Sequence, residues 1–279
     1  MSFKIGFHFD RAANTESAKP PVAVQPPEPV KSVVQVYFPD RNQSYAYYND
    51  TFDLHPGDLV YVEGKLEGLR GRVTEVSRTF KIKPSAYKRV IAAIDTNICG
   101  KFYMAGSHLV TTDRFALPYE KAVTWFMPPE STKEEYVCAG DGTAFALDTF
   151  AGWNISASIA ERGREYYAQN RVVCLENDSG HCRAIVVGSS SYLVEFEYAG
   201  GEIRNMTCDC YCAGACKHEY AVLLQMRELM EYTRQSAHAG AFEGDYLATV
   251  SKDAFFEFAF NGKTDGILSL GQLRTGKED

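Results

Sequence analysis

Short stretches in which apolar and polar residues alternate recur along most of the chain. The first covers residues 3–9, where Phe3, Ile5, Phe7 and Phe9 would share one face of an extended strand. Similar stretches follow at 33–38, 45–48, 58–63, 70–77 and 87–94, separated by Gly, Pro, Asn and Asp. Five short strands in about 60 residues predict a small, strongly bent β-barrel of the SH3-like kind.

A second group of elements follows residue 150. A helix is expected over 155–169, and strand patterns follow at 171–176, 182–187, 191–198 and 202–208. Short turns rich in Gly, Ser and Asn join these strands, which is typical of an antiparallel meander. A further helix begins near Glu219, because Tyr220, Leu223 and Leu224 form an apolar stripe. We therefore expect an antiparallel sheet covered by a helix.

The remaining segments complete an α+β organisation. Residues 101–105 and 108–112 form a candidate hairpin, and 116–126 a candidate short helix. Five of the eleven prolines lie between residues 11 and 31, which favours an extended linker. The predicted divisions are an N-terminal strand (1–10), a Pro-rich linker (11–32), a small β-barrel (33–95), a connecting region (96–150), a sheet-and-helix domain (151–235) and a C-terminal tail that packs on it (236–279). The first strand either packs on its own protein or adds to the edge of a partner's sheet.

Composition narrows the class of protein. The chain has 279 residues, 45% of them hydrophobic, and a formal net charge of −7, which disfavours nucleic-acid binding through the field of the whole protein. No run of about 18 apolar residues is present, so we expect no membrane span. With eight cysteines and no apparent secretory signal, we expect a cytoplasmic protein with reduced thiols.

One segment departs from the acidic average. Residues 64–90 hold eight basic residues against Glu67 and Glu75, a net charge of +6, with Phe80 and Tyr87 among them. Basic residues bind phosphates and aromatic rings stack on bases, so this segment is the candidate site for DNA or RNA. Its candidate residues are Arg70, Arg72, Arg78, Lys81, Lys83, Lys88 and Arg89. The alternative is a solvated strand face that protects the edges of the barrel.

Three cysteines and one histidine lie close together in the sequence as Cys208, Cys210, Cys216 and His218. Cys208 and Cys210 are two residues apart, so an extended strand presents both sulfur atoms on the same side. The residues between Cys210 and Cys216 include Gly214, which helps the chain to turn back. Thiolate and neutral imidazole are ligands that zinc prefers, and four of them form a closed structural site. The spacing therefore predicts a bound zinc ion.

The surrounding sequence resembles the SWIM zinc-finger family over residues 151–232. The resemblance includes Arg162-Gly-Arg-Glu-Tyr-Tyr167, Tyr192-Leu-Val-Glu-Phe196, the Cys-x-Cys and Cys-x-His pairs and the Ala-Val-Leu-Leu of the helix that follows. It implies that Cys208, Cys210, Cys216 and His218 bind zinc, and that the domain binds DNA or protein, as in helicases and transposases that contain this finger. The spacer of five residues is short for the family, and Cys212 provides a further thiolate. A set of Cys210, Cys212, Cys216 and His218 therefore stays open.

These features favour a protein without enzymatic activity. Four protein ligands leave a zinc ion no open position for a substrate. Gly262-Lys263-Thr264 resembles the end of a phosphate-binding loop, but Glu257 stands where that loop needs a glycine. The leading hypothesis is a zinc-binding, non-enzymatic module that binds nucleic acid through residues 64–90. The alternative is an adaptor that recruits a protein partner, such as a helicase, through the N-terminal strand and the SWIM domain.

Overall fold

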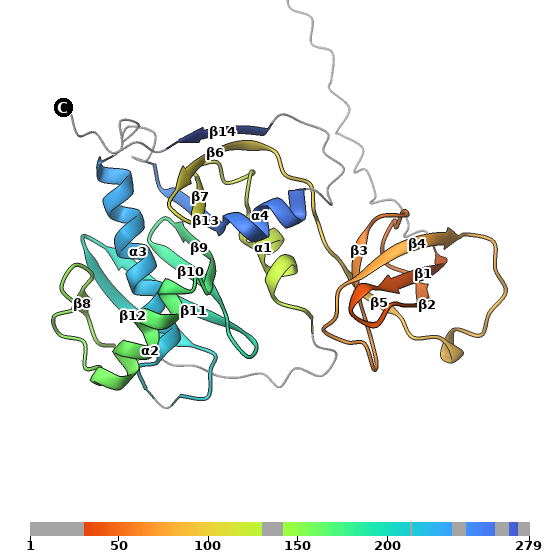
Figure 1. Ribbon diagram of the computed structural model, residues 1–279, viewed down its shortest axis with the longest axis horizontal. Helices are drawn as coiled ribbons and strands as arrows, with labels where there is room; N and C mark the ends of the chain where they lie inside the picture. Colours follow the sequence, from red (N-terminus) through yellow and green to blue (C-terminus); the bar gives the residue numbers. More distant parts are fainter. Residues whose placement is uncertain (1–30, 130–141, 213, 236–243, 260–267, 273–279) are drawn as a thin grey trace, which may run out of the picture.

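Two β-sheets organise the residues that the computed structural model describes, which are 31–129, 142–212, 214–235, 244–259 and 268–272 (Figure 1). The first sheet is built from residues before 95 and the second from residues after 99. Together with four α-helices in the described residues, the sheets confirm a mixed fold of helices and strands. The predicted strand at 1–10, and all but the end of the predicted linker at 11–32, lie outside the described residues.

The first sheet has five strands in the order β2-β1-β4-β3-β5, and the pairs are antiparallel. The strands are β1 (Ser32–Phe38), β2 (Gln43–Asn49), β3 (Leu59–Val62), β4 (Gly71–Ser77) and β5 (Val90–Ala93), with short 3-10 helices at Pro39–Arg41 and Pro84–Ala86. Alternation along β1 buries Val34, Val36 and Phe38 on one face. These side chains join valines of β3 and β4 in a separate small core.

This sheet does not close into a barrel, so the SH3-like barrel expected over 33–95 is not shown. A single bridge, between Tyr48 and Arg89, connects the edge strand β2 to the residue before β5. Beside it, the Tyr48 N–H donates to the Lys88 carbonyl at 2.9 Å. β3 and β5 have only four residues each, which leaves little strand for a continuous ladder around the sheet.

The second sheet has nine strands in the order β14-β6-β7-β13-β9-β10-β11-β12-β8. The strands are β6 (Gly100–Ala105), β7 (His108–Thr111), β8 (Phe145–Ala146), β9 (Val172–Asp178), β10 (His181–Val187), β11 (Ser191–Ala199), β12 (Glu202–Cys208), β13 (Tyr246–Ser251) and β14 (Leu268–Gln272). β9 to β12 form the predicted antiparallel meander, and β6 and β7 form the predicted hairpin. The segment 96–150 and the tail therefore supply strands to the same sheet as the meander.

Helices cover both faces of the nine-stranded sheet. They are α1 (Tyr119–Phe126), α2 (Ala157–Ala168), α3 (Lys217–Gln235) and α4 (Lys252–Ala259). Along β10, Ala184 and Val186 belong to a core shared with α3, whereas Ile185 between them belongs to a core shared with α1 and α4. Because successive residues of a strand point to opposite faces, α3 lies on one face, and α1 and α4 on the other. α2 packs along α3 through a small cluster that contains Ala160 and Leu224.

The five-stranded sheet contacts the larger unit on the side of α4. Leu59 and Tyr61 of β3 belong to the core that contains the α4 residues Phe255 and Phe258. Arg70 forms an ion pair with Glu257 of α4 at 2.8 Å. The two sheets are therefore joined by buried apolar contacts and by one charged contact at their edge.

Candidate metal centre

The end of β12 and the start of α3 bring the four predicted zinc ligands together. Cys208 is the last residue of β12, and Cys216 and His218 flank Lys217, the first residue of α3. The ligand atoms of Cys208, Cys210, Cys216 and His218 all lie within 4.8 Å of one another. Cys216 and His218 are buried, and the other two are half-buried. This group can hold a metal ion.

Asp209 fixes the Cys-x-Cys turn to β11. Its backbone N–H donates to the Leu193 carbonyl at 3.1 Å, and its carboxylate accepts from the Leu193 N–H at 2.9 Å. Cys208 is paired with Val194 in the ladder between β11 and β12. The backbone that carries the first two ligands is therefore held against the sheet rather than hanging free in a loop.

Glu219 forms two hydrogen bonds with Cys216 at the first turn of α3. Its carboxylate accepts from the Cys216 N–H at 2.8 Å, and its own N–H donates to the Cys216 Sγ at 3.4 Å. This is the reciprocal arrangement of a capping box, with cysteine in the place of serine or threonine. The spacing of three residues between Cys216 and Glu219 is the sequence signal that could have identified Glu219 as part of the site.

His218 is packed between two tyrosine rings. Tyr192 of β11 stacks on the imidazole with ring centroids 4.1 Å apart and an angle of 18°, and Tyr166 of α2 meets it edge-on at 5.4 Å. The Nε2 atom is buried and has no hydrogen-bond partner in the described part of the chain. Ring packing, rather than a hydrogen bond at Nε2, therefore orients the imidazole so that Nδ1 faces the sulfur atoms.

The distance between the Cys208 and His218 ligand atoms is compatible with a shared tetrahedral zinc ion. With Zn–S about 2.3 Å and Zn–N about 2.0–2.1 Å, a sulfur and a nitrogen ligand lie roughly 3.6 Å apart across the tetrahedral angle. The His218 Nδ1 lies 3.7 Å from the Cys208 Sγ. Three soft sulfur donors with one imidazole are also a ligand set that suits zinc.

Interactions among the thiols concentrate negative charge on Cys216. The hydrogen bond from the Cys208 thiol, helped by His218 and the Glu219 N–H, lowers the pKa of Cys216 in spite of burial. The same hydrogen bond, together with burial and the charge of Cys216, raises the pKa of Cys208. Burial raises the pKa of Cys210 to about 12. Deprotonation of all three thiols requires a compensating positive charge, which a bound metal ion supplies.

Cys212, the alternative ligand, is exposed and is not part of the group of four. The adjacent Tyr211 has 88% of its surface exposed. Cys174 and Cys182 are buried elsewhere in the nine-stranded sheet, where burial raises the pKa of each thiol. The sulfur atoms that converge in the described residues are therefore those of Cys208, Cys210 and Cys216.

The arginines of the basic segment have partners within the protein. Besides the ion pair between Arg70 and Glu257, Arg78 lies 3.1 Å from Asp53 and Arg89 lies 2.7 Å from Asp50. The guanidinium groups of Arg70 and Arg89 also lie over the rings of Phe258 and Tyr48. Arg72 donates to the Gly57 carbonyl at 3.2 Å. The four arginines of the basic segment thus all form polar contacts within the protein.

The lysines of the same segment differ from the arginines. Lys81, Lys83 and Lys88 are exposed, and none of them forms an ion pair with a described residue. The neighbouring Phe80 is half-buried and meets Tyr48 edge-on at 6.2 Å. Three exposed cations therefore stay available on the surface of the five-stranded unit.

Comparisons with known protein families, with curated proteins and with solved structures found no match. Among the described residues, no helix is both long enough and apolar enough to cross a membrane. The resemblance to SWIM zinc fingers therefore rests on the sequence features of residues 151–232 alone.

Proposed function

We propose that this protein is a SWIM-type zinc-binding protein in which Cys208, Cys210, Cys216 and His218 hold a structural zinc ion. The observation that carries the proposal is the convergence of three cysteine sulfurs and one imidazole nitrogen within 4.8 Å, two of them on buried residues. An ion at this point ties the end of β12 to the first turn of α3. That bond joins the sheet to the helix that covers it, where a short turn provides few apolar contacts.

Zinc analysis of purified single variants tests this proposal. Cys208→Ser and His218→Ala each remove one ligand, and we expect zinc content to fall well below the one ion per chain of the wild type. Cys212→Ser is the matched control, because it removes a thiol from the same turn but outside the group of four. Full zinc content in Cys208→Ser together with loss in Cys212→Ser would instead support the set that includes Cys212.

The function that we propose for the whole chain is non-enzymatic binding of nucleic acid, with zinc in a structural role. Support comes from the exposed lysines Lys81, Lys83 and Lys88, whose ammonium groups have no carboxylate partner among the described residues. Such lysines bind phosphates with a strong dependence on salt. The arginines that the sequence also suggested contribute less, because the carboxylates paired with Arg70, Arg78 and Arg89 reduce the positive potential around them.

Charge reversal of the three lysines to glutamate tests the nucleic-acid proposal. We expect the triple variant to lose retention on single- and double-stranded oligonucleotides at low salt. The control reverses three exposed basic residues elsewhere, namely Lys101, Arg204 and Arg234. Equal losses in both variants would indicate a response to net charge, and unchanged retention in the lysine variant would contradict the proposed surface.

An adaptor that recruits a protein partner, such as a helicase, is the second candidate. It is favoured by the ion-paired arginines, by the net charge of −7 and by the exposed aromatic residue Tyr211 beside the metal ligands. This function predicts capture of a defined partner that is lost with a zinc chelator and with Tyr211→Ser, while the lysine variant captures it normally. A purified protein that binds oligonucleotides at physiological salt without any partner would contradict it.

A further inference from the structure

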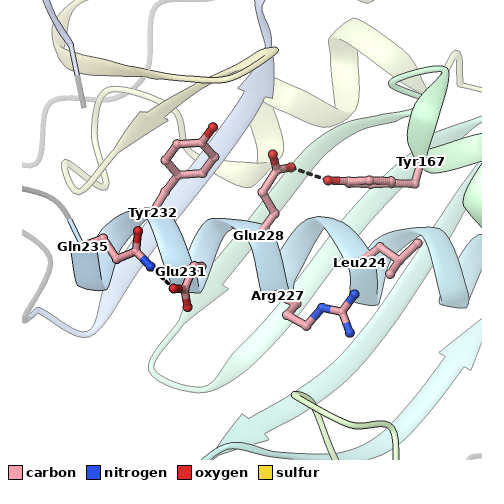
Figure 2. A pocket seen from close by; sticks show the side chains of 7 residues that line it. All are labelled: Tyr167, Leu224, Arg227, Glu228, Glu231, Tyr232 and Gln235. Carbon is pink, nitrogen blue, oxygen red and sulfur yellow. Dashed lines mark hydrogen bonds between the residues drawn. The ribbon is translucent and has the colours of Figure 1, made fainter. Parts of the chain in front are cut away.

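A cavity of about 530 Å³ lies along the second half of α3, away from the metal centre (Figure 2). Six of its seven lining residues come from α3 at the spacing of one helix face, and Tyr167 comes from the end of α2. The volume falls within the range of pockets that hold small molecules. The lining combines aromatic rings with carboxylates, so the cavity is not purely apolar.

Glu228 is a half-buried carboxylate of this cavity, and the groups that donate hydrogen bonds to it among the described residues are neutral. Its Oε2 accepts from the Tyr167 hydroxyl at 2.8 Å and from the Gln225 amide at 3.4 Å. Burial and the hydrogen bond to Glu228 raise the pKa of Tyr167, so the hydroxyl keeps its proton and donates. No described lysine or arginine forms an ion pair with Glu228. The carboxylate is therefore oriented but its charge is not neutralised.

Arg227 also lines the cavity, but its guanidinium forms contacts outside the cavity rather than an ion pair with Glu228. Arg227 donates to the Asp148 carbonyl at 3.3 Å, and its guanidinium lies 5.0 Å from the centre of the Phe150 ring. Glu231 adds a second carboxylate one helical turn from Glu228, although it is exposed and interacts with Gln235 and Arg234. The lining thus holds two carboxylates, Glu228 and Glu231, and one guanidinium, Arg227, which leaves a net charge of −1.

Two tyrosines flank Glu228, as Figure 2 shows. A methyl group added at Gly106, in the turn between β6 and β7, would lie 3.7 Å from the Glu228 Oε1 and 3.8 Å from the Tyr232 hydroxyl. The Glu228 Oε1 and the Tyr232 hydroxyl therefore both lie near Gly106, and the hydrogen bonds that Glu228 accepts from described residues are made to Oε2. An ammonium group that pairs with Oε1 would meet both the carboxylate charge and the electron-rich ring of a tyrosine.

We propose that this cavity binds a small organic cation with an alkylammonium group, for which Glu228 is the counter-ion and Tyr167 and Tyr232 are the walls. The inference is independent of the metal centre and of the nucleic-acid surface, since it shares no residue with either. A free diamine and a lysine side chain offer the same chemistry, and the size of the cavity admits both.

Calorimetric titration of the full, zinc-loaded chain tests the proposal. We expect diaminobutane to bind at millimolar concentration or below and to raise the melting temperature, and its uncharged analogue butanediol to do neither. An acetylated and amidated lysine forms the second arm of the experiment. Binding of either amine supports the site and identifies the source of the cation, whereas failure of both, or equal binding of butanediol, would overturn it.

Two variants identify the counter-ion. Glu228→Gln keeps the shape and the hydrogen bonds but removes the charge, and we expect the affinity for the amine to fall about tenfold or more. Tyr167→Phe should weaken binding less, because it releases the carboxylate without removing it. Glu120→Gln, an exposed carboxylate on α1, is the matched control and should bind as the wild type does. Wild-type affinity in Glu228→Gln, with normal zinc content and circular dichroism, would contradict the assignment.

Discussion

The cysteine–histidine cluster and the basic segment 64–90 differ in how far along the chain their contacts reach. All four candidate metal ligands lie between Cys208 and His218, so the spacing in the sequence already restricts where their side chains can meet. The arginines of the basic segment contact partners far from them in the sequence, as Arg70 does with Glu257. A set of candidate ligands that are close in the sequence can therefore be predicted from the sequence. A local excess of positive charge cannot, because residues distant in the sequence can form ion pairs with it.

The largest expected effect concerns the metal ligands. Cys216→Ser should lower the free energy of unfolding by about 3 kcal/mol or more, because zinc bonds to the folded state are lost and a buried ligand set is left incomplete. Cys212→Ser should change it by less than about 0.5 kcal/mol. Chemical denaturation of both variants, with and without a zinc chelator, provides the measurement. If a chelator leaves the free energy of unfolding of the wild type unchanged, the cluster does not stabilise the fold by binding a metal ion.

The sequence was sufficient to predict those elements that depend on a short-range pattern of residues. The meander at 171–208, the hairpin at 101–112 and the helix near Glu219 all follow from alternation, turn residues or an apolar stripe. The sequence was insufficient where distant strands meet. Nothing in the tail indicates that β13 lies between β7 and β9, because a strand pattern does not specify its neighbours. The same limit explains why a barrel was expected but is not shown, since the pattern predicts five strands but does not specify whether they close.

In the candidate metal centre, the candidate ligands could likewise be predicted from the sequence, whereas most of the residues that position them could not. The four residues that come together could be named from their spacing, and Glu219 could have been found from the capping pattern. Tyr192 and Asp209 could not, because their roles depend on how β11 lies beside the turn and the first residues of α3. Supporting groups of this kind are contributed by tertiary packing rather than by the motif.

The second prediction therefore addresses a supporting residue. Tyr192→Leu removes the ring that stacks on His218, and we expect zinc affinity to fall about tenfold, since groups that orient a ligand contribute roughly 10- to 100-fold. Tyr198→Leu, on the same strand but with no ring contact to His218, is the control. Competition with a chelating dye measures both. Equal affinities would mean that the two thiol-bearing segments alone fix the imidazole.

A smaller effect is expected where the two sheets meet. Arg70→Met removes the ion pair with Glu257 and the contact with the Phe258 ring, and we expect a loss of about 1 kcal/mol in the free energy of unfolding. Arg78→Met is the matched control, because its ion pair with Asp53 lies on the surface and should contribute less than about 0.5 kcal/mol. A double-mutant cycle with Glu257→Gln isolates the ion pair, and zero coupling would show that this pair contributes nothing to stability.

The smallest expected effect on stability belongs to the exposed lysines. Reversal of Lys81, Lys83 and Lys88 to glutamate should change the free energy of unfolding by less than about 0.5 kcal/mol, since they form no ion pair with a described residue. Thermal denaturation checks this beside the oligonucleotide measurement. A surface used for phosphate binding should lose affinity without losing stability, whereas Arg70→Met should lose stability first. A lysine variant as unstable as Arg70→Met would mean that these side chains have structural partners, and the contrast between lysines and arginines would be wrong.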